Sequence, residues 1–534
     1  MPGAALMATA VAAMSGVDPG GSRRLGAVLR RRGARPSGKP TAMMRVRALA
    51  LALALALALA LAAVGAGPVL AQAAPASAQF TLVVIDPPGR GFNDPRPADP
   101  AAGNNGAATL GQQRLRVVQQ AAALWAQQIA STVPIRVEIE MTNLPCEPER
   151  SVLGWAGPTF VAWRVPGAPR SDVLYPIALA NALSGVELEP NEADIQASFN
   201  LAIDLGCRDG ASGWWYGLDR DQLVPDDRIA LLPVALHELA HGLGFTATMD
   251  LQDGSYPSGI ASVWSHYLYD LSLQRHWRMM SAAERVASAR NDPHLVWTGE
   301  RVNRRLDQVL ATAPVLVAEG ARGPVVIEEL GLAQFGAPWP DELSAPVLAV
   351  NDGIGDPGDG CQVPFANGER LAGRIALIDR GTCTFVEKAA HAQAHGAVAV
   401  VIVNNTDETP PGMAGSDPSI TIPVVMVTRR VGADLRRGRV RHGLQVAFDR
   451  ADELAGTAAG CLRMYAPAAA ESGSSVSHFH SAAQPGLLMA PAIGRHHFDQ
   501  LDLSVDLLHD IGWPRPLATP PPAGDNHCLS GPLP

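Results

Sequence analysis

The chain has 534 residues, enough for three or four domains at roughly 100–200 residues each. Hydrophobic residues make up 47% and charged residues 17%, a balance that excludes a fully disordered protein. Residues 1–78 hold nine basic side chains and one acid, which leaves 33 basic and 50 acidic residues in the remainder. So acidic a remainder argues against nucleic acid as a partner.

Residues 1–78 are expected to be a leader that ends in a cleavable signal peptide. Arg45 and Arg47 precede an unbroken apolar run over 48–64, and the small residues 76–78 offer a cleavage site. A basic start, an apolar middle and a small-residue end are typical of a secretory signal. A run of this length is also compatible with a transmembrane anchor. We expect export to the extracellular space or periplasm, with no stable membrane anchor after cleavage.

Secondary structure after the leader is predicted from hydrophobic periodicity. Strands are expected over 80–85, 133–141 and 195–201, and an amphipathic helix over 110–129. Six cysteines follow the leader, and an even count in an exported protein favours three disulfides, with 15 possible pairings. These cysteines are Cys146, Cys207, Cys361, Cys383, Cys461 and Cys528.

The most informative motif is His237-Glu238-Leu239-Ala240-His241. Histidines four residues apart lie one turn apart on the same face of a helix, the spacing that a single Zn²⁺ ion requires. Glu238 lies beside them, where it can accept a proton from a water activated by the metal. Pro233 suits the first helical turn and Gly244 a sharp end. The alternative is a chance match on a core helix.

A catalytic zinc ion needs a third protein ligand. In the extended motif HExxHxxGxxH that ligand stands at position 247, which is Ala247 here, so it must come from farther along the chain. His478 is the preferred candidate, because the run Leu487-Leu488-Met489-Ala490-Pro491 follows it after a Pro-Gly turn. His480 and His266 are its main rivals, and His496 and His497 are further candidates.

These segments resemble the metzincin-like zinc metallopeptidases of the leishmanolysin type. In that family a distant segment supplies the third histidine, and a methionine turn (Met-turn) lies beneath the zinc. The resemblance implies a set of roles: metal ligands His237, His241 and His478, catalytic base Glu238, and Met-turn residue Met489. Residues 502–514 resemble the closing helix of such domains.

Residues 313–452 differ in character, since short β-branched runs alternate with a helix expected over 385–395. The stretches 359–361, 371–405 and 422–426 resemble a protease-associated (PA) domain, an accessory unit of exported peptidases, receptors and sorting proteins. The resemblance implies a disulfide between Cys361 and Cys383. By elimination, the other four cysteines pair most simply as Cys146 with Cys207 and Cys461 with Cys528.

The sequence therefore predicts an α+β protein in which a β-rich α/β PA domain interrupts a metzincin-like catalytic domain. The expected parts are the leader (1–78), the first catalytic part with the metal helix (79–312), the PA domain (313–452) and the second catalytic part (453–534).

The expected function is a secreted zinc-dependent endopeptidase that acts on proteins or peptides, with the strand 195–201 aligning the substrate. The alternative is an exported protein that binds peptides or partners through its PA domain, with a structural or inactive zinc site.

Overall fold

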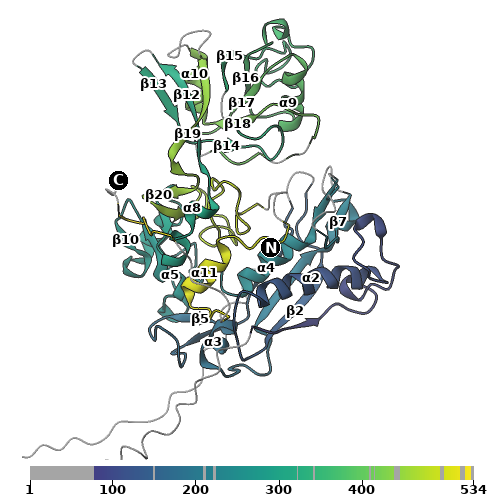
Figure 1. Ribbon diagram of the computed structural model, residues 1–534, viewed down its shortest axis with the longest axis vertical. Coiled ribbons are helices and arrows are strands. Elements are labelled where there is room, and N and C mark those ends of the chain that lie inside the picture. Colours follow the sequence, from purple (N-terminus) through teal and green to yellow (C-terminus); the bar gives the residue numbers. More distant parts are fainter. Residues whose placement is uncertain are drawn as a thin grey trace, which may run out of the picture. The chain divides into compact units, whose positions relative to one another are not determined.

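The computed structural model (Figure 1) describes residues 77–147, 151–207, 212–219, 224–225, 227–320, 323–340, 343–407, 410–413, 415, 417–437, 445–492, 498–516 and 524–530. The predicted leader lies outside these residues except for its last two positions. In the described ranges, no helix is both long and apolar enough to cross a membrane.

A four-stranded sheet carries the first part of the chain. Its order is β1 (Phe80–Val84), β2 (Ile135–Thr142), β6 (Ile195–Asn200) and β3 (Gly154–Pro158). The first three strands run parallel, and β3 pairs antiparallel with β6. The proposal that strand 195–201 aligns a substrate was wrong, because β6 lies between two other strands. Among the described strands, β1 and β3 form the two edges of this sheet, and β3 is the edge that contacts α4. The Gly-Trp-Ala-Gly-Pro sequence of β3 lacks the β-branched residues that mark a strand.

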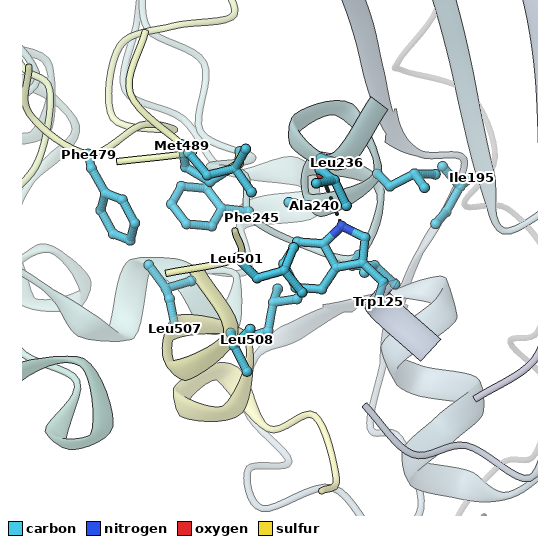
Figure 2. Close-up of a cluster of buried hydrophobic side chains, with 14 of the residues drawn as sticks. Trp125, Ile195, Leu236, Ala240, Phe245, Phe479, Met489, Leu501, Leu507 and Leu508 are labelled. Atoms are coloured by element: carbon cyan, nitrogen blue, oxygen red, sulfur yellow. Dashed lines mark hydrogen bonds between the residues drawn. The ribbon is translucent and has the colours of Figure 1, made fainter. Parts of the chain in front are cut away.

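Two helices pack side by side on this sheet, α2 (Leu110–Ala126) and α4 (Leu231–Gly242) (Figure 1). The Trp125 indole N–H donates to the Leu236 carbonyl at 3.0 Å, which joins the two helices within the apolar core (Figure 2). Every residue of α4 is buried. The helix ends before Gly244, whose φ of +113° favours glycine.

A five-stranded antiparallel sheet joins segments from both sides of the predicted PA domain. Its order is β10 (Arg275–His276), β9 (Leu268–Asp270), β11 (Leu295–Trp297), β21 (Cys461–Arg463) and β20 (Thr457–Ala458). Val296 of β11 pairs with Arg463 of β21, across more than 160 residues of chain. The intervening segment therefore leaves and re-enters one structural unit.

The intervening segment forms an eight-stranded mixed sheet. Its order is β13 (Gly323–Ile327), β12 (Thr312–Gly320), β19 (Gln445–Leu454), β15 (Leu343–Ala349), β16 (Ile375–Asp379), β17 (Ala399–Val403), β18 (Val424–Val427) and β14 (Gly331–Leu332). Strands β15 to β18 are parallel. Helices α9 (Phe385–Ala394) and α10 (Arg429–Arg437) pack on opposite faces, since they contribute to different apolar clusters. Burial on both faces explains the continuous apolar runs of the central strands.

The remaining elements are shorter. Helix α11 (Ser504–Ile511) occupies the predicted closing helix and is entirely buried. All six cysteines are paired, as Cys146–Cys207, Cys361–Cys383 and Cys461–Cys528. The other short elements are β4 (Val161–Trp163), β5 (Leu174–Pro176), α3 (Ile177–Ser184), β7 (Gly213–Trp215), β8 (Arg228–Ala230), α5 (Val263–Tyr267), α6 (Ala282–Ser288), α7 (Glu300–Asn303) and α8 (Leu306–Val309), together with single 3₁₀ turns.

Candidate metal centre

Three histidines from two distant segments meet in the core. Helix α4 presents His237 and His241 one turn apart, and residues 474–480 bring His478 against them. The Nε2 atom of His237 lies 3.0 Å from that of His478 and 3.1 Å from that of His241. The third pair, His241 and His478, is separated by 3.3 Å. All three side chains are buried.

The opposite ring nitrogen of each histidine faces a backbone carbonyl oxygen. His237 Nδ1 donates to Leu488 O at 2.7 Å, and His241 Nδ1 donates to Phe245 O at 2.7 Å. His478 Nδ1 donates to Ser474 O at 2.8 Å. A carbonyl oxygen only accepts, so each Nδ1 carries the proton and each neutral ring keeps a lone pair on Nε2.

Three converging lone pairs can hold a cation between them. Burial lowers the pKa of His241 to about 4 and that of His478 well below its usual value, so these two rings are neutral at neutral pH. A tetrahedral zinc ion with Zn–N bonds of about 2.0–2.1 Å separates its nitrogen ligands by about 3.3 Å. The observed spacing and the fixed Nδ1 atoms therefore fit one zinc ion held by these three rings.

Glu238 lies beside this cluster without belonging to it. Its carboxyl group is buried, which raises its pKa to about 8 despite a hydrogen bond from the Ala156 backbone N–H. Gly154 of β3 comes so close that an added Cβ atom would lie 3.0 Å from Glu238 Oε1. Strand β3 thus lines one side of the carboxyl group.

Met489 lies in the apolar core that supports α4. Figure 2 shows it beside Phe245 and near Phe479, and its backbone oxygen accepts from the Phe479 N–H at 2.8 Å. The preceding residue, Leu488, supplies the carbonyl that holds His237. Asp502 in turn accepts from the Leu488 N–H at 2.5 Å. The segment predicted as a Met-turn therefore fixes one ring of the cluster through its backbone.

The rival histidines lie elsewhere. His266, on α5, stacks 6.5 Å from the ring of His276. His480 accepts from the Ala482 N–H at Nδ1, and its Nε2 lies 3.2 Å from Asp292 Oδ1. Among the residues that the structure describes, the one group of three or more potential metal ligands is His237, His241 and His478. The further candidates His496 and His497 lie outside the described residues.

Sequence reasoning missed the backbone carbonyls that orient the rings and the glycine beside Glu238. Carbonyl acceptors carry no residue-type signal. Two of the three nevertheless lie four residues from their histidine, Phe245 after His241 and Ser474 before His478. A search for tight turns beside each candidate ligand would have found these two.

Comparison with known proteins identifies one part of the chain. Residues 343–435 match the PA domain family. The chain is 37% identical over 98 residues to the probable lipoprotein aminopeptidase LpqL of Mycobacterium tuberculosis, covering 18% of this chain and 19% of that one. It is 37% identical over 111 residues to signal peptide peptidase-like 3 of Arabidopsis thaliana, covering 20% of each.

Among solved structures, the zinc aminopeptidase BSAP from Bacillus subtilis matches 28% of this chain and 34% of its own, at 24% identity and a TM-score of 0.19. The aminopeptidase from Aneurinibacillus sp. strain AM-1 matches 26% and 31%, at 28% identity and a TM-score of 0.21. The chain spans about a fifth of the length of these curated relatives and about a third of these solved structures. The family match shows that the chain contains a PA domain. The geometry of its three-histidine cluster is, independently of these neighbours, consistent with zinc.

Proposed function

We propose that the chain is an exported zinc-dependent endopeptidase of the metzincin-like, leishmanolysin type. The observation that carries this proposal is the convergence of three unprotonated histidine nitrogens beside a buried glutamate. His237, His241 and His478 would hold the ion, with Met489 in the turn below. When bound, zinc supplies Lewis-acid polarisation of a peptide carbonyl and acidifies a water molecule.

Glu238 moves the proton in this proposal. Its carboxylate accepts a proton from the attacking water and passes it to the nitrogen of the leaving amine. Burial favours the protonated carboxyl, whereas a cation in the adjacent cluster favours the carboxylate, so the two influences oppose each other. A carboxyl group whose pKa is set by these opposing influences can both accept the proton from water and release it to the leaving amine.

The free edge of β3 is the proposed guide for the substrate. Asn200 N donates to Leu153 O at 2.9 Å, and Thr159 N donates to Asp194 O at 3.0 Å. Hydrogen-bonded and non-bonded pairs alternate along an antiparallel ladder. The backbone groups of residues 153, 155, 157 and 159 therefore face β6 and the residues next to it in the chain. Gly154 and Ala156, which lie between them, direct their backbone groups away from β6. The Ala156 N–H donates to the Glu238 carboxyl group, so an extended peptide can pair with the backbone groups of Gly154 and with the carbonyl oxygen of Ala156.

The edge favours internal cleavage. A strand binds substrate residues through repeating backbone groups and does not require a free terminal amine. The partners are therefore proteins or peptides in extended form, and endopeptidase activity is the finer part of this proposal.

The PA domain supports a second candidate, a protein that captures peptides or partners while its metal cluster is structural.

The two candidates differ in whether the protein cleaves peptide bonds. The test is to measure zinc content, and then cleavage of a denatured protein and of an N-terminally acetylated peptide, with and without a chelator. Chelator-sensitive cleavage of the acetylated peptide supports the endopeptidase. Cleavage restricted to peptides with a free amine indicates an aminopeptidase. Zinc without cleavage favours the binding protein.

A further inference from the structure

A buried lysine contacts a disulfide sulfur in the PA domain. Lys388, on α9, has no exposed side-chain surface. Its Nζ atom donates to the Asp359 backbone oxygen at 2.5 Å and lies 3.2 Å from Sγ of Cys361. Cys361 is bonded to Cys383. One ammonium group therefore touches one sulfur of the pair.

Lysine is rare in this chain, which makes the contact more informative. The sequence has two lysines, Lys39 in the predicted leader and Lys388, whereas its other basic residues are arginines. A lysine ammonium is a compact point charge on a flexible stem, and a guanidinium is a wide planar fork. The enclosed position beside Cys361 suits the compact charge.

The two sulfurs have different surroundings. Cys383 lies in the turn that precedes α9, next to the exposed residues Gly381, Thr382 and Thr384. Cys361 faces the buried lysine, and its backbone N–H donates to the carboxylates of Asp352 and Asp359, each at 3.0 Å. Both cysteines are half-buried, but exposed residues flank Cys383, whereas Cys361 follows the buried Gly360 and its sulfur contacts Lys388. We therefore take Cys383 as the sulfur that an incoming reagent attacks.

We propose that Cys383 is a site of thiolation by low-molecular-weight thiols, with Cys361 as the leaving group. The thiolate of the small thiol attacks Sγ of Cys383, the Cys361–Cys383 bond breaks, and its electron pair remains on Cys361 as a thiolate. The new bond joins Cys383 to the small thiol, so no oxidant is consumed. The ammonium of Lys388 stabilises the departing Cys361 thiolate.

Nearby carboxylates oppose this stabilisation and set its limit. Asp352 and Asp359 are both buried close to Cys361. Each is engaged with the Cys361 backbone N–H, which offsets part of its charge, whereas the ammonium contacts the sulfur itself. Direct contact outweighs the carboxylates because electrostatic interactions weaken with distance.

The Cys461–Cys528 disulfide provides an internal control. Cys461 is fully buried, and its Sγ lies 3.7 Å from the Ala459 carbonyl oxygen. Sγ of Cys528 lies 3.9 Å from the Trp297 carbonyl oxygen. Sγ of Cys361 also lies near two carbonyl oxygens, Asp359 at 3.6 Å and Gly381 at 3.7 Å, so the carbonyls do not separate the two bonds. Lys388 is the one lysine among the described residues, so neither sulfur of Cys461–Cys528 contacts a lysine ammonium. This bond should therefore exchange more slowly than Cys361–Cys383.

The test is to treat the full chain with reduced glutathione at pH 7.5 and to map the cysteines by mass spectrometry over time. We expect glutathione on Cys383, a free thiol at Cys361, and exchange about tenfold faster than at Cys461–Cys528. Lys388→Met should slow the exchange about tenfold. Arg380→Met removes a cation from the same turn without touching Cys361, and should leave the rate within about twofold.

Two outcomes overturn the proposal: glutathione found mainly on Cys361, or an unchanged rate in a folded Lys388→Met protein. If that variant does not fold, Cys383→Ser provides the second measurement. The Cys361 thiol in that protein should react with iodoacetamide with a pKa below about 8.5, the value of a free cysteine. A pKa at or above that value contradicts the role of Lys388.

Discussion

His478 and His480 are two residues apart, and both are buried, yet their surroundings differ in kind. His478 points its unprotonated nitrogen at two other unprotonated nitrogens. His480 points its Nε2 at the carboxylate of Asp292, which also accepts from Arg463 at 2.6 Å. The first group lacks a positive charge and the second contains one. The partners of a buried histidine, rather than its burial, thus separate a candidate ligand from a structural residue.

The cluster around His480 positions the segment that carries His478. The backbone of His480 donates to Arg463 O, and the backbone of Tyr465 donates to His478 O. His480 and Arg463 hold the pKa of Asp292 well below its usual range despite burial. We therefore expect substitutions at His478 to affect metal binding, and substitutions in the cluster of His480, Asp292 and Arg463 to affect the stability of the fold.

The largest expected difference is between His478→Ala and His480→Ala. His478→Ala should lose zinc and all measurable peptidase activity, because two imidazoles and a water do not retain the ion well. His480→Ala should keep close to one zinc per chain, since its ring belongs to a separate cluster. Metal analysis after dialysis decides between them, and equal zinc loss in both variants would remove the distinction. His266→Ala is a second control that should also keep zinc.

Glu238→Ala separates the role of Glu238 in catalysis from metal binding. Because Glu238 does not converge with the three nitrogens, the variant should keep its zinc. Its kcat should fall by about 10³, within the range of general acid–base catalysis. Zinc content and kcat measured on one preparation check this prediction. Zinc loss in this variant would place Glu238 among the ligands.

Asp292→Asn should destabilise the fold by about 3 kcal/mol and spare the zinc, since it removes the charge from a buried ion-pair cluster. The depressed pKa of Asp292 stabilises the folded state above the ordinary carboxyl pKa, near 4, and this contribution is lost as the pH falls towards the folded-state pKa. The difference between wild type and variant should therefore shrink below about pH 4. Urea unfolding at pH 7 and pH 3 measures it, and a difference that grows at pH 3 would reverse the assigned sign.

The smallest expected effect compares two glycines of β3. A Cβ atom at residue 154 would lie 3.0 Å from both Cγ and Oε1 of Glu238, whereas nothing lies within 4 Å of one at residue 157. Gly154→Ala should therefore lower kcat about tenfold, or 1.4 kcal/mol, with unchanged zinc content. Gly157→Ala is the matched control. Equal kcat values for the two variants would show that β3 does not position Glu238.

The sequence predicted the elements whose side chains carry a pattern. The alternation in β2 and the helical motif around His237 correspond to a strand and a helix of the structure. Strand β3 escaped prediction because two glycines and a proline hide it. The separate environments of His478 and His480 also escaped, because Asp292 and Arg463 lie far from them in sequence and only the folded chain brings them together.

The most direct measurement is anomalous diffraction at the zinc edge from crystals of the zinc-loaded protein. We predict one peak bound by Nε2 of His237, His241 and His478, at about 2.0–2.1 Å from each atom. Glu238 should lie outside the ligand shell, and His480 should remain bonded to Asp292. A peak ligated by His480 or His266, or no peak beside α4, would contradict the account.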